Sequence, residues 1–148
     1  MSFHSVADAR MFVTAGNAII TLESHKTGVH FTYRVRQAKD DHDRPVNRWF
    51  VSVLTGPDNE NDYRYIGMLG AKAGILAFYA TKGSKISCDA PSFRAFDYFW
   101  TAVLRGTIPS CLEVRHEGRC GRCARTLTVP ESVDSGFGPE CITKVKAA

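Results

Sequence analysis

The chain has 148 residues, of which 19 are Lys or Arg and 15 are Asp or Glu, so its formal net charge is +4. Apolar residues make up 44% and charged residues 23%, which is ordinary for a globular protein. The length fits one domain, or a domain of about 110 residues with a small appendage. The mild charge is spread along the chain, which excludes the strong basic stripe of a protein that binds nucleic acid by charge alone.

The distribution of apolar and cysteine residues favours an intracellular protein. No apolar run approaches the roughly 18 residues that a membrane-spanning helix needs. Residues 1–20 lack a basic segment followed by an apolar core, so we expect no secretory signal and no membrane partner. Four of the five cysteines lie between residues 111 and 141, which favours a metal site in a reducing compartment over a disulfide framework. We therefore expect a cytoplasmic location.

The first predicted element is a helix over residues 5–15. Ser5 and Asp8 have the spacing of a capping box, in which each side chain serves the other's backbone N–H. This pattern favours a helix that packs on the protein's own sheet, and a partner-binding amphipathic helix is the alternative. Four apolar side chains share one face of the helix: Val6, Ala9, Phe12 and Val13.

Alternating apolar and polar residues predict an antiparallel sheet with one buried and one wet face. The clearest strand turns Tyr33 and Val35 to the buried face and Arg34 and Arg36 to the other, where the two arginines could contact a phosphate backbone. A fifth strand is predicted over 76–81. The first four strands are predicted over 17–24, 29–37, 48–55 and 63–69.

Two further stretches carry candidate chemistry that we interpret as structural. The mixed charges around His42, in residues 38–47, are typical of an exposed loop rather than of an acid–base or hard-metal site. Pro91 opens a helix that runs to about Arg105. Its aromatic stripe is more typical of a core than of a ligand site, and we expect it to cross the buried face of the sheet.

A cysteine motif follows, with the spacing H-x3-C-x2-C-x17-C. The C-x2-C pair can turn back onto one ion, and Gly121 is expected to supply a positive φ there. Gly138 and Pro139 predict the start of a helix just before the last cysteine. Three thiolates and an imidazole form a closed tetrahedral site, which is what structural Zn²⁺ prefers. The predicted ligands are His116, Cys120, Cys123 and Cys141.

Other interpretations of these residues stay open or fail. Cys111 competes with His116 for the fourth position, and a disulfide between Cys120 and Cys141, or free buried thiols, would replace the metal altogether. The His-Glu-x-x-Cys order lacks the second histidine of a metalloprotease helix, and the zinc deaminase signature is also incomplete. A closed site has no position for a reacting water, so we do not expect an enzyme.

The segment Gly-Arg-Cys-Gly-Arg-Cys-Ala-Arg-Thr-Leu-Thr-Val-Pro-Glu-Ser, with the later Ser-Gly-Phe-Gly-Pro-Glu-Cys, resembles a small zinc-ribbon or treble-clef-like domain. Such domains recur at the C-terminus of uncharacterised phage and bacterial proteins. The usual pattern has Gly and Ile where this chain has Ala124 and Phe137. The resemblance covers about 116–148, and it implies a metal site and a phage or prophage origin, with the host cytoplasm as the location. It implies no reaction.

We therefore predict an α+β fold. A four- or five-stranded antiparallel sheet with flanking helices would occupy residues 1–106, and a small zinc module would occupy 107–148. The module is too small to fold without its ion.

Two functions fit this arrangement. The first is a zinc-containing accessory protein that binds nucleic acid, with single strands favoured, because aromatic and arginine side chains on a sheet can stack bases and follow phosphates. The second is a protein-binding adaptor or an inhibitor of a host protein complex, for example in anti-defence. Five arginines are the candidate nucleic-acid contacts: Arg119, Arg122 and Arg125 at the cysteine turn, and Arg34 and Arg36 on the sheet.

Overall fold

The computed structural model describes residues 2–147. Its strands form one antiparallel sheet in the order β5-β4-β3-β2-β1-β6. Among the described residues, no helix is both long and apolar enough to cross a membrane. The strands are β1 (Asn17–Ser24), β2 (His30–Lys39), β3 (Pro45–Leu54), β4 (Tyr63–Lys72), β5 (Ile75–Tyr79) and β6 (Leu112–His116). The helices are α1 (Val6–Val13), α2 (Pro91–Leu104), α3 (Pro130–Ser135) and α4 (Pro139–Ala147).

The mixed helix and strand content is as predicted, but the sheet has six strands rather than four or five. The additional strand, β6, pairs with β1 from Ile20 opposite His116 to Ser24 opposite Leu112. The sequence prediction placed this segment in the zinc module and assigned it no strand, because five residues with charges at alternate positions give a weak pattern. The predicted boundary after residue 106 therefore precedes a strand that completes the sheet.

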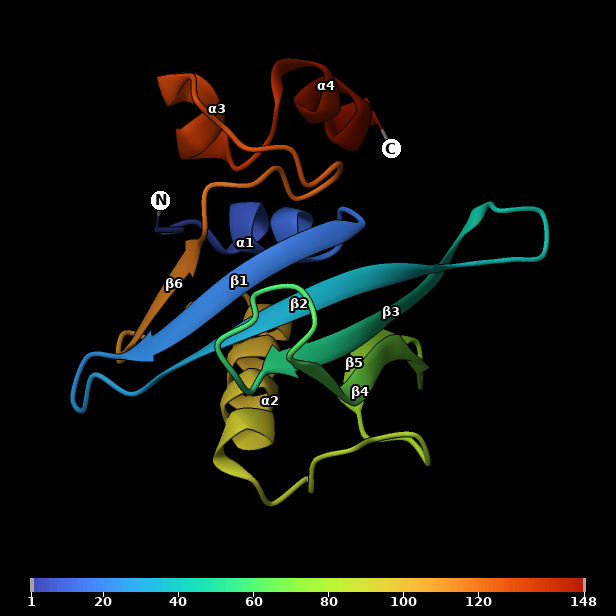
Figure 1. Cartoon of the computed structure of the whole chain (residues 1–148), viewed down its shortest axis with the longest axis vertical. Helices are drawn as coiled ribbons and strands as arrows, with labels where there is room; N and C mark the ends of the chain where they lie inside the picture. Colours follow the sequence, from blue (N-terminus) through green and yellow to red (C-terminus); the bar gives the residue numbers. More distant parts are fainter. Residues whose placement is uncertain (1, 148) are drawn as a thin grey trace.

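Helix α2 covers one face of the sheet, as its aromatic stripe predicted (Figure 1). Phe96 and Phe99 are fully buried there. Two fully buried polar rings of this core have partners. The Trp100 Nε1–H donates to the Leu76 carbonyl (2.8 Å), and the Tyr33 hydroxyl donates to the Ser92 carbonyl (2.6 Å). The opposite face of β1 to β4 carries the polar residues of the alternation.

Helix α1 lies between the sheet and the C-terminal segment, in which Figure 1 shows α3 and α4 next to each other. Ser5 caps this helix by accepting from the Asp8 N–H (3.3 Å). Phe12 is fully buried, and its ring centroid lies 5.7 Å from that of Phe137, which precedes α4. Asn17 adds backbone and side-chain bonds to the turn that holds the first cysteines. The apolar face of α1 therefore packs within the protein, as predicted.

Candidate functional site

Cys120, Cys123 and Cys141 converge beside α4. Their Sγ atoms all lie within 4.8 Å of one another. Two thiolates bound about 2.3 Å from one zinc ion can be at most about 4.6 Å apart, so this group needs little movement to hold a metal ion. Cys120 and Cys141 are buried and Cys123 is exposed, and all three are free thiols rather than a disulfide.

Local structure on both sides brings the three sulfurs together. The Ala124 N–H donates to the Cys120 carbonyl (2.9 Å) and closes the turn between the first two cysteines. Pro139 starts α4, as predicted, and this places Cys141 in the first turn of that helix. The Gly138 N–H lies 3.5 Å from the Cys120 Sγ and links the helix start to the turn.

The positive φ of this turn falls at Ala124 (64°) and not at Gly121, so that prediction was wrong. Gly121 is small for a different reason. A Cβ built on it would lie 2.7 Å from the Phe12 Cδ2 and 3.2 Å from the Phe137 Cε1. Because Gly121 has no side chain, the turn that holds Cys120 and Cys123 can pack directly on the Phe12 ring of α1.

The structure does not bring His116 into the sulfur group. The Gly118 N–H donates to its Nδ1 (2.9 Å), and its Nε2 donates to the Val133 carbonyl (2.6 Å). Its ring is fully buried, with the centroids of Phe3 and Phe12 each 5.6 Å away. Burial lowers the pKa of His116, and the bond to Val133 only partly opposes this. His116 is thus a neutral core side chain with both nitrogens occupied.

The competing ligand Cys111 lies at the opposite end of β6 from the cysteine turn. Its carbonyl accepts from the His25 N–H (2.9 Å), and its Sγ is 3.8 Å from the Tyr98 hydroxyl. Within residues 2–147, no fourth histidine, cysteine, aspartate or glutamate joins the group of three. The structure therefore assembles three of the four predicted ligands.

The thiolate is the form that binds metals, and the surroundings favour it at Cys120 but not at Cys141. Burial alone would raise the pKa of Cys120, but neighbouring backbone N–H groups, including that of Gly138, bring it below the ordinary thiol value. Burial raises the pKa of Cys141, and the Arg122 guanidinium, whose Nη1 lies 3.8 Å from this Sγ, opposes the rise. The donor set and its charge environment fit a thiophilic metal ion such as zinc.

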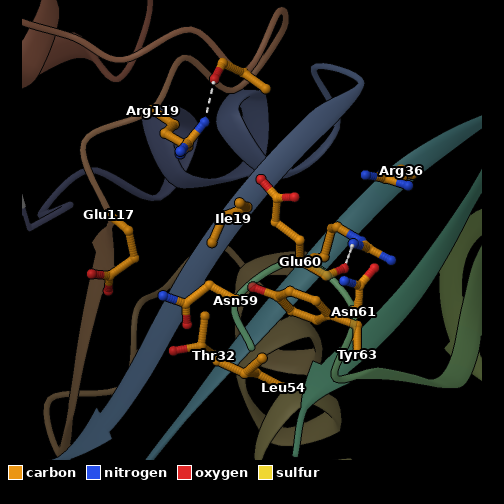
Figure 2. A pocket seen from close by; sticks show the side chains of 12 residues that line it. Ile19, Thr32, Arg36, Leu54, Asn59, Glu60, Asn61, Tyr63, Glu117 and Arg119 are labelled. Carbon is orange, nitrogen blue, oxygen red and sulfur yellow. Dashed lines mark hydrogen bonds between the residues drawn. The ribbon is translucent and has the colours of Figure 1, made fainter. Parts of the chain in front are cut away.

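A hollow of about 1120 Å³ lies on the polar face of the sheet. Its floor is formed by β1 and β2, and its walls by the loop of residues 55–62 and by the segment of residues 117–124 (Figure 2). Arg34 and Arg36 enter it from β2, and Arg119 enters from the cysteine turn. Three of the five arginines proposed from the sequence therefore line one site, although Arg34 and Arg119 are 85 residues apart in the chain.

The other two proposed arginines lie next to the cysteines. Arg122 contacts Cys141, and Arg125 lines a smaller cavity bounded by the three cysteines. In the part of the chain that the structure describes, no salt bridge involves any of the five arginines. By contrast, Arg115 binds Glu113 (3.3 Å) and Glu117 (3.5 Å), and also Glu23.

The aromatic side chains divide between the two faces of the sheet. Tyr33 and Trp49 are buried and cannot stack on a base. Tyr63 lines the hollow, with the Arg34 guanidinium carbon 4.4 Å from its ring centroid. Phe50 is 45% exposed and lies directly across the strand pair from Arg36.

Sequence reasoning missed the contribution of Phe50 and of the loop over residues 59–61, which lines the hollow. The alternation could have found Phe50, because it places this residue on the arginine-bearing face. The loop carries no comparable signal, since nothing in its composition says that it folds back over β2.

Comparison with known families reaches only the C-terminal segment. Residues 112–146 match DUF6011, a family of unknown function. The match covers β6, all three grouped cysteines, α3 and all but the last residue of α4. None of the curated proteins and none of the solved structures matches the chain. The DUF6011 match therefore marks the cysteine-bearing C-terminal segment as one that recurs in other proteins, and it carries no activity.

Proposed function

We propose that the protein is a zinc-containing accessory protein that binds single-stranded nucleic acid across the hollow on the sheet. The observation that carries the proposal is the convergence of Arg34, Arg36 and Arg119, none in a salt bridge among the described residues, on one concave surface. Antiparallel sheets hold single strands by stacking bases on aromatic rings and following phosphates with arginine and lysine.

The arginines differ in how ready they are to bind phosphate. Arg34 already donates to the Glu60 carbonyl (3.2 Å) and covers Tyr63, so it acts mainly as a fixed positive charge. Arg36 is exposed, and the one hydrogen bond of the Arg119 side chain within residues 2–147 is to the Ala124 carbonyl (3.3 Å). Their guanidinium groups can grip a phosphate through two N–H donors. These two residues are therefore the main phosphate contacts in the proposal.

Two carboxylates, Glu60 and Glu117, also line the hollow and would oppose a polyanion. Glu117 accepts from the Thr21 hydroxyl (2.5 Å) and shares Arg115 (3.5 Å) with Glu23 and Glu113, so only part of its charge is offset. Glu60 sits on the loop wall. The charge that remains at the floor of the hollow is positive.

The walls and the neighbouring aromatics favour a single strand over a duplex. A flexible strand can enter a hollow walled on two sides, whereas a rigid duplex would rest on the rims. Phe50 stands next to Arg36 across the strand pair, and its ring centroid is 5.9 Å from that of Tyr65. This aromatic pair extends the arginine surface and offers a stacking position, which can contribute about 1–3 kcal/mol per base.

Zinc has a structural part in the proposal. Cys120, Cys123 and Cys141 would hold the ion and fix the turn that carries Arg119. The ion supplies folding free energy when bound, because a short segment of this kind rarely keeps its shape without it.

The direct test is fluorescence anisotropy with single- and double-stranded oligonucleotides at several salt concentrations. Each phosphate contact releases counterions, so replacing Arg36 or Arg119 by Glu should weaken binding to all sequences and reduce the salt slope by about 1. Arg94→Glu is the matched control, because Arg94 is exposed on α2 and faces away from the hollow. Failure of the wild type to bind any oligonucleotide at low salt would reject the proposal.

Arg122 and Arg125 were also candidate contacts from the sequence, but they are poor choices for this test. Arg122 contacts the Cys141 Sγ, and Arg125 lines the cavity beside the cysteines. Charge reversal at either position would disturb the metal site as well as any phosphate contact. Arg36 and Arg119 separate the two effects better.

The second candidate function is a protein-binding adaptor or an inhibitor of a host protein complex. The observation that favours it is the mixed lining of the hollow, where Glu60 and Glu117 accompany the arginines, together with the exposed ring of Phe50. A partner with both charges and an apolar residue would match such a surface. Binding that survives high salt and ignores oligonucleotide competitors would favour this function over the first.

A further inference from the structure

A second cavity, of about 300 Å³, borders the sulfur group directly. All three cysteines line it, so an ion held by their sulfurs would stand in its wall. Its volume is at the lower end of the range for small-molecule sites. Polar groups also line it, among them Arg125, Thr126 and Ser132.

The described chain supplies three metal donors beside this cavity, the sulfurs of Cys120, Cys123 and Cys141. His116 is held in the core by two hydrogen bonds, through Nδ1 and Nε2, and Cys111 lies at the far end of β6. Tetrahedral zinc takes four donors, and sites with three protein ligands keep the fourth position for water or another small ligand. That position would adjoin the cavity, because the cavity is bounded by the same three cysteines.

We propose that this cavity admits a small anionic donor that completes the coordination of the metal ion and exchanges with solvent. The inference rests on the metal part of the proposed function and is independent of nucleic-acid binding. Three thiolates and a divalent ion carry one net negative charge, so an added anion needs nearby positive charge. Arg125 lines the cavity and Arg122 reaches the Cys141 Sγ, and these two guanidinium groups supply that charge.

Among the described residues that line this cavity, Glu140 carries the one carboxylate, and it is the competing fourth ligand from the chain. It is exposed on the first turn of α4 and, unlike its neighbour Cys141, does not belong to the close donor group. If Glu140 closed the site, an external anion would have no position to take. Closure by Glu140 and coordination by an external anion give different responses in the absorption spectrum of the Co²⁺-loaded protein.

The test uses the whole 148-residue chain loaded with Co²⁺, whose visible absorption bands report the donors of a tetrahedral site. Azide is the anionic probe and imidazole is the neutral one. We expect azide to shift the bands saturably and at lower concentration than imidazole. Arg125→Gln should raise the azide concentration at half-saturation about tenfold, the effect of losing one charge-assisted hydrogen bond.

The control variants are Glu140→Gln and His116→Gln, which should leave the azide-free spectrum unchanged. Bands that azide does not move, together with a changed azide-free spectrum in either variant, would overturn the proposal and identify the residue that closes the site. A wild-type protein that binds no Co²⁺ would also overturn it, by removing the ion. That last result would also remove the zinc part of the proposed function. The other results leave oligonucleotide binding untouched, so failure of the anion proposal with the metal bound is distinguishable from failure of the proposed function.

Discussion

At the scale of single residues, the cysteine turn depends on two small side chains that serve different purposes. Gly121 makes room for the Phe12 ring, and Ala124 bends the backbone at a φ of 64°. The sequence suggested glycine freedom at position 121, because glycine is the residue that takes a positive φ at least cost. In the structure Ala124 takes the positive φ, and the need for glycine at position 121 follows only from its close contact with the Phe12 ring.

We expect Ala124→Gly to stabilise the protein by about 1 kcal/mol, because an L-residue at a positive φ carries a steric cost that glycine avoids. Urea unfolding in the presence of saturating zinc would measure the change. Gly121→Ala is the matched comparison and should destabilise, since its Cβ would meet the Phe12 ring at 2.7 Å. An Ala124→Gly protein that is less stable than the wild type would show that the turn does not carry this cost.

His116 makes stability depend on pH. Burial lowers its pKa in the folded protein below the unfolded value of about 6.5, so the unfolded chain takes up a proton first as the pH falls. The stability that comes from burying the neutral ring is therefore present above about pH 6.5 and is lost as the pH falls further.

We expect the wild type to lose more unfolding free energy than His116→Gln between about pH 7.5 and about pH 5.5. Thiol protonation affects both proteins alike, so the difference between their denaturation curves isolates the histidine. Equal losses in the two proteins would mean that His116 does not titrate as a buried neutral group.

At the scale of elements, the C-terminal segment shares its core with the rest of the chain. Phe137 and Cys120 belong to the same buried cluster as Phe12 of α1, and β6 is part of the main sheet. The backbone of Asn17 donates to the Gly121 carbonyl (2.8 Å) and links the cysteine turn to the start of β1. Loss of the metal should therefore be felt beyond the segment that holds it.

We expect the purified protein to contain about one zinc ion per chain and Cys141→Ser to contain less, because three thiolates are needed to hold the ion. Removing zinc with a chelator should lower the melting temperature of the whole chain in one transition. Elemental analysis and calorimetry would measure the two effects. Full metal content in Cys141→Ser would refute the ligand set, and a separate small transition for the C-terminal segment would refute the shared core.

At the scale of the whole molecule, patterns with a strong period were predictable from the sequence and long-range placement was not. The alternation around Tyr33 and the stripe around Phe96 identified the buried face and the helix that covers it, because each repeats over several turns or residues. Strand β6 is too short for a clear period. Helix α3 (Pro130–Ser135) was missed for the same reason.

The candidate site shows the same division. The spacing of Cys120, Cys123 and Cys141 identified the donor group, since local turns and a helix start are readable in sequence. His116 has the spacing of a fourth ligand, but its ring packs against Phe12 of α1 and its Nε2 donates to the Val133 carbonyl of α3. These contacts arise only from the packing of the two helices. The hollow joins Arg36 and Arg119, and their proximity follows from the docking of the C-terminal segment on the sheet.

The proposed function places single-stranded nucleic acid in the hollow on the polar face of the sheet. Backbone amide NMR shifts during titration with a short single-stranded oligonucleotide test it most directly. We predict that the largest shifts fall on Thr32, Arg36, residues 59–61 and Arg119, which come from three separate parts of the chain but line one site. Shifts confined to α2 on the opposite face, or no shifts at low salt, would contradict the claim.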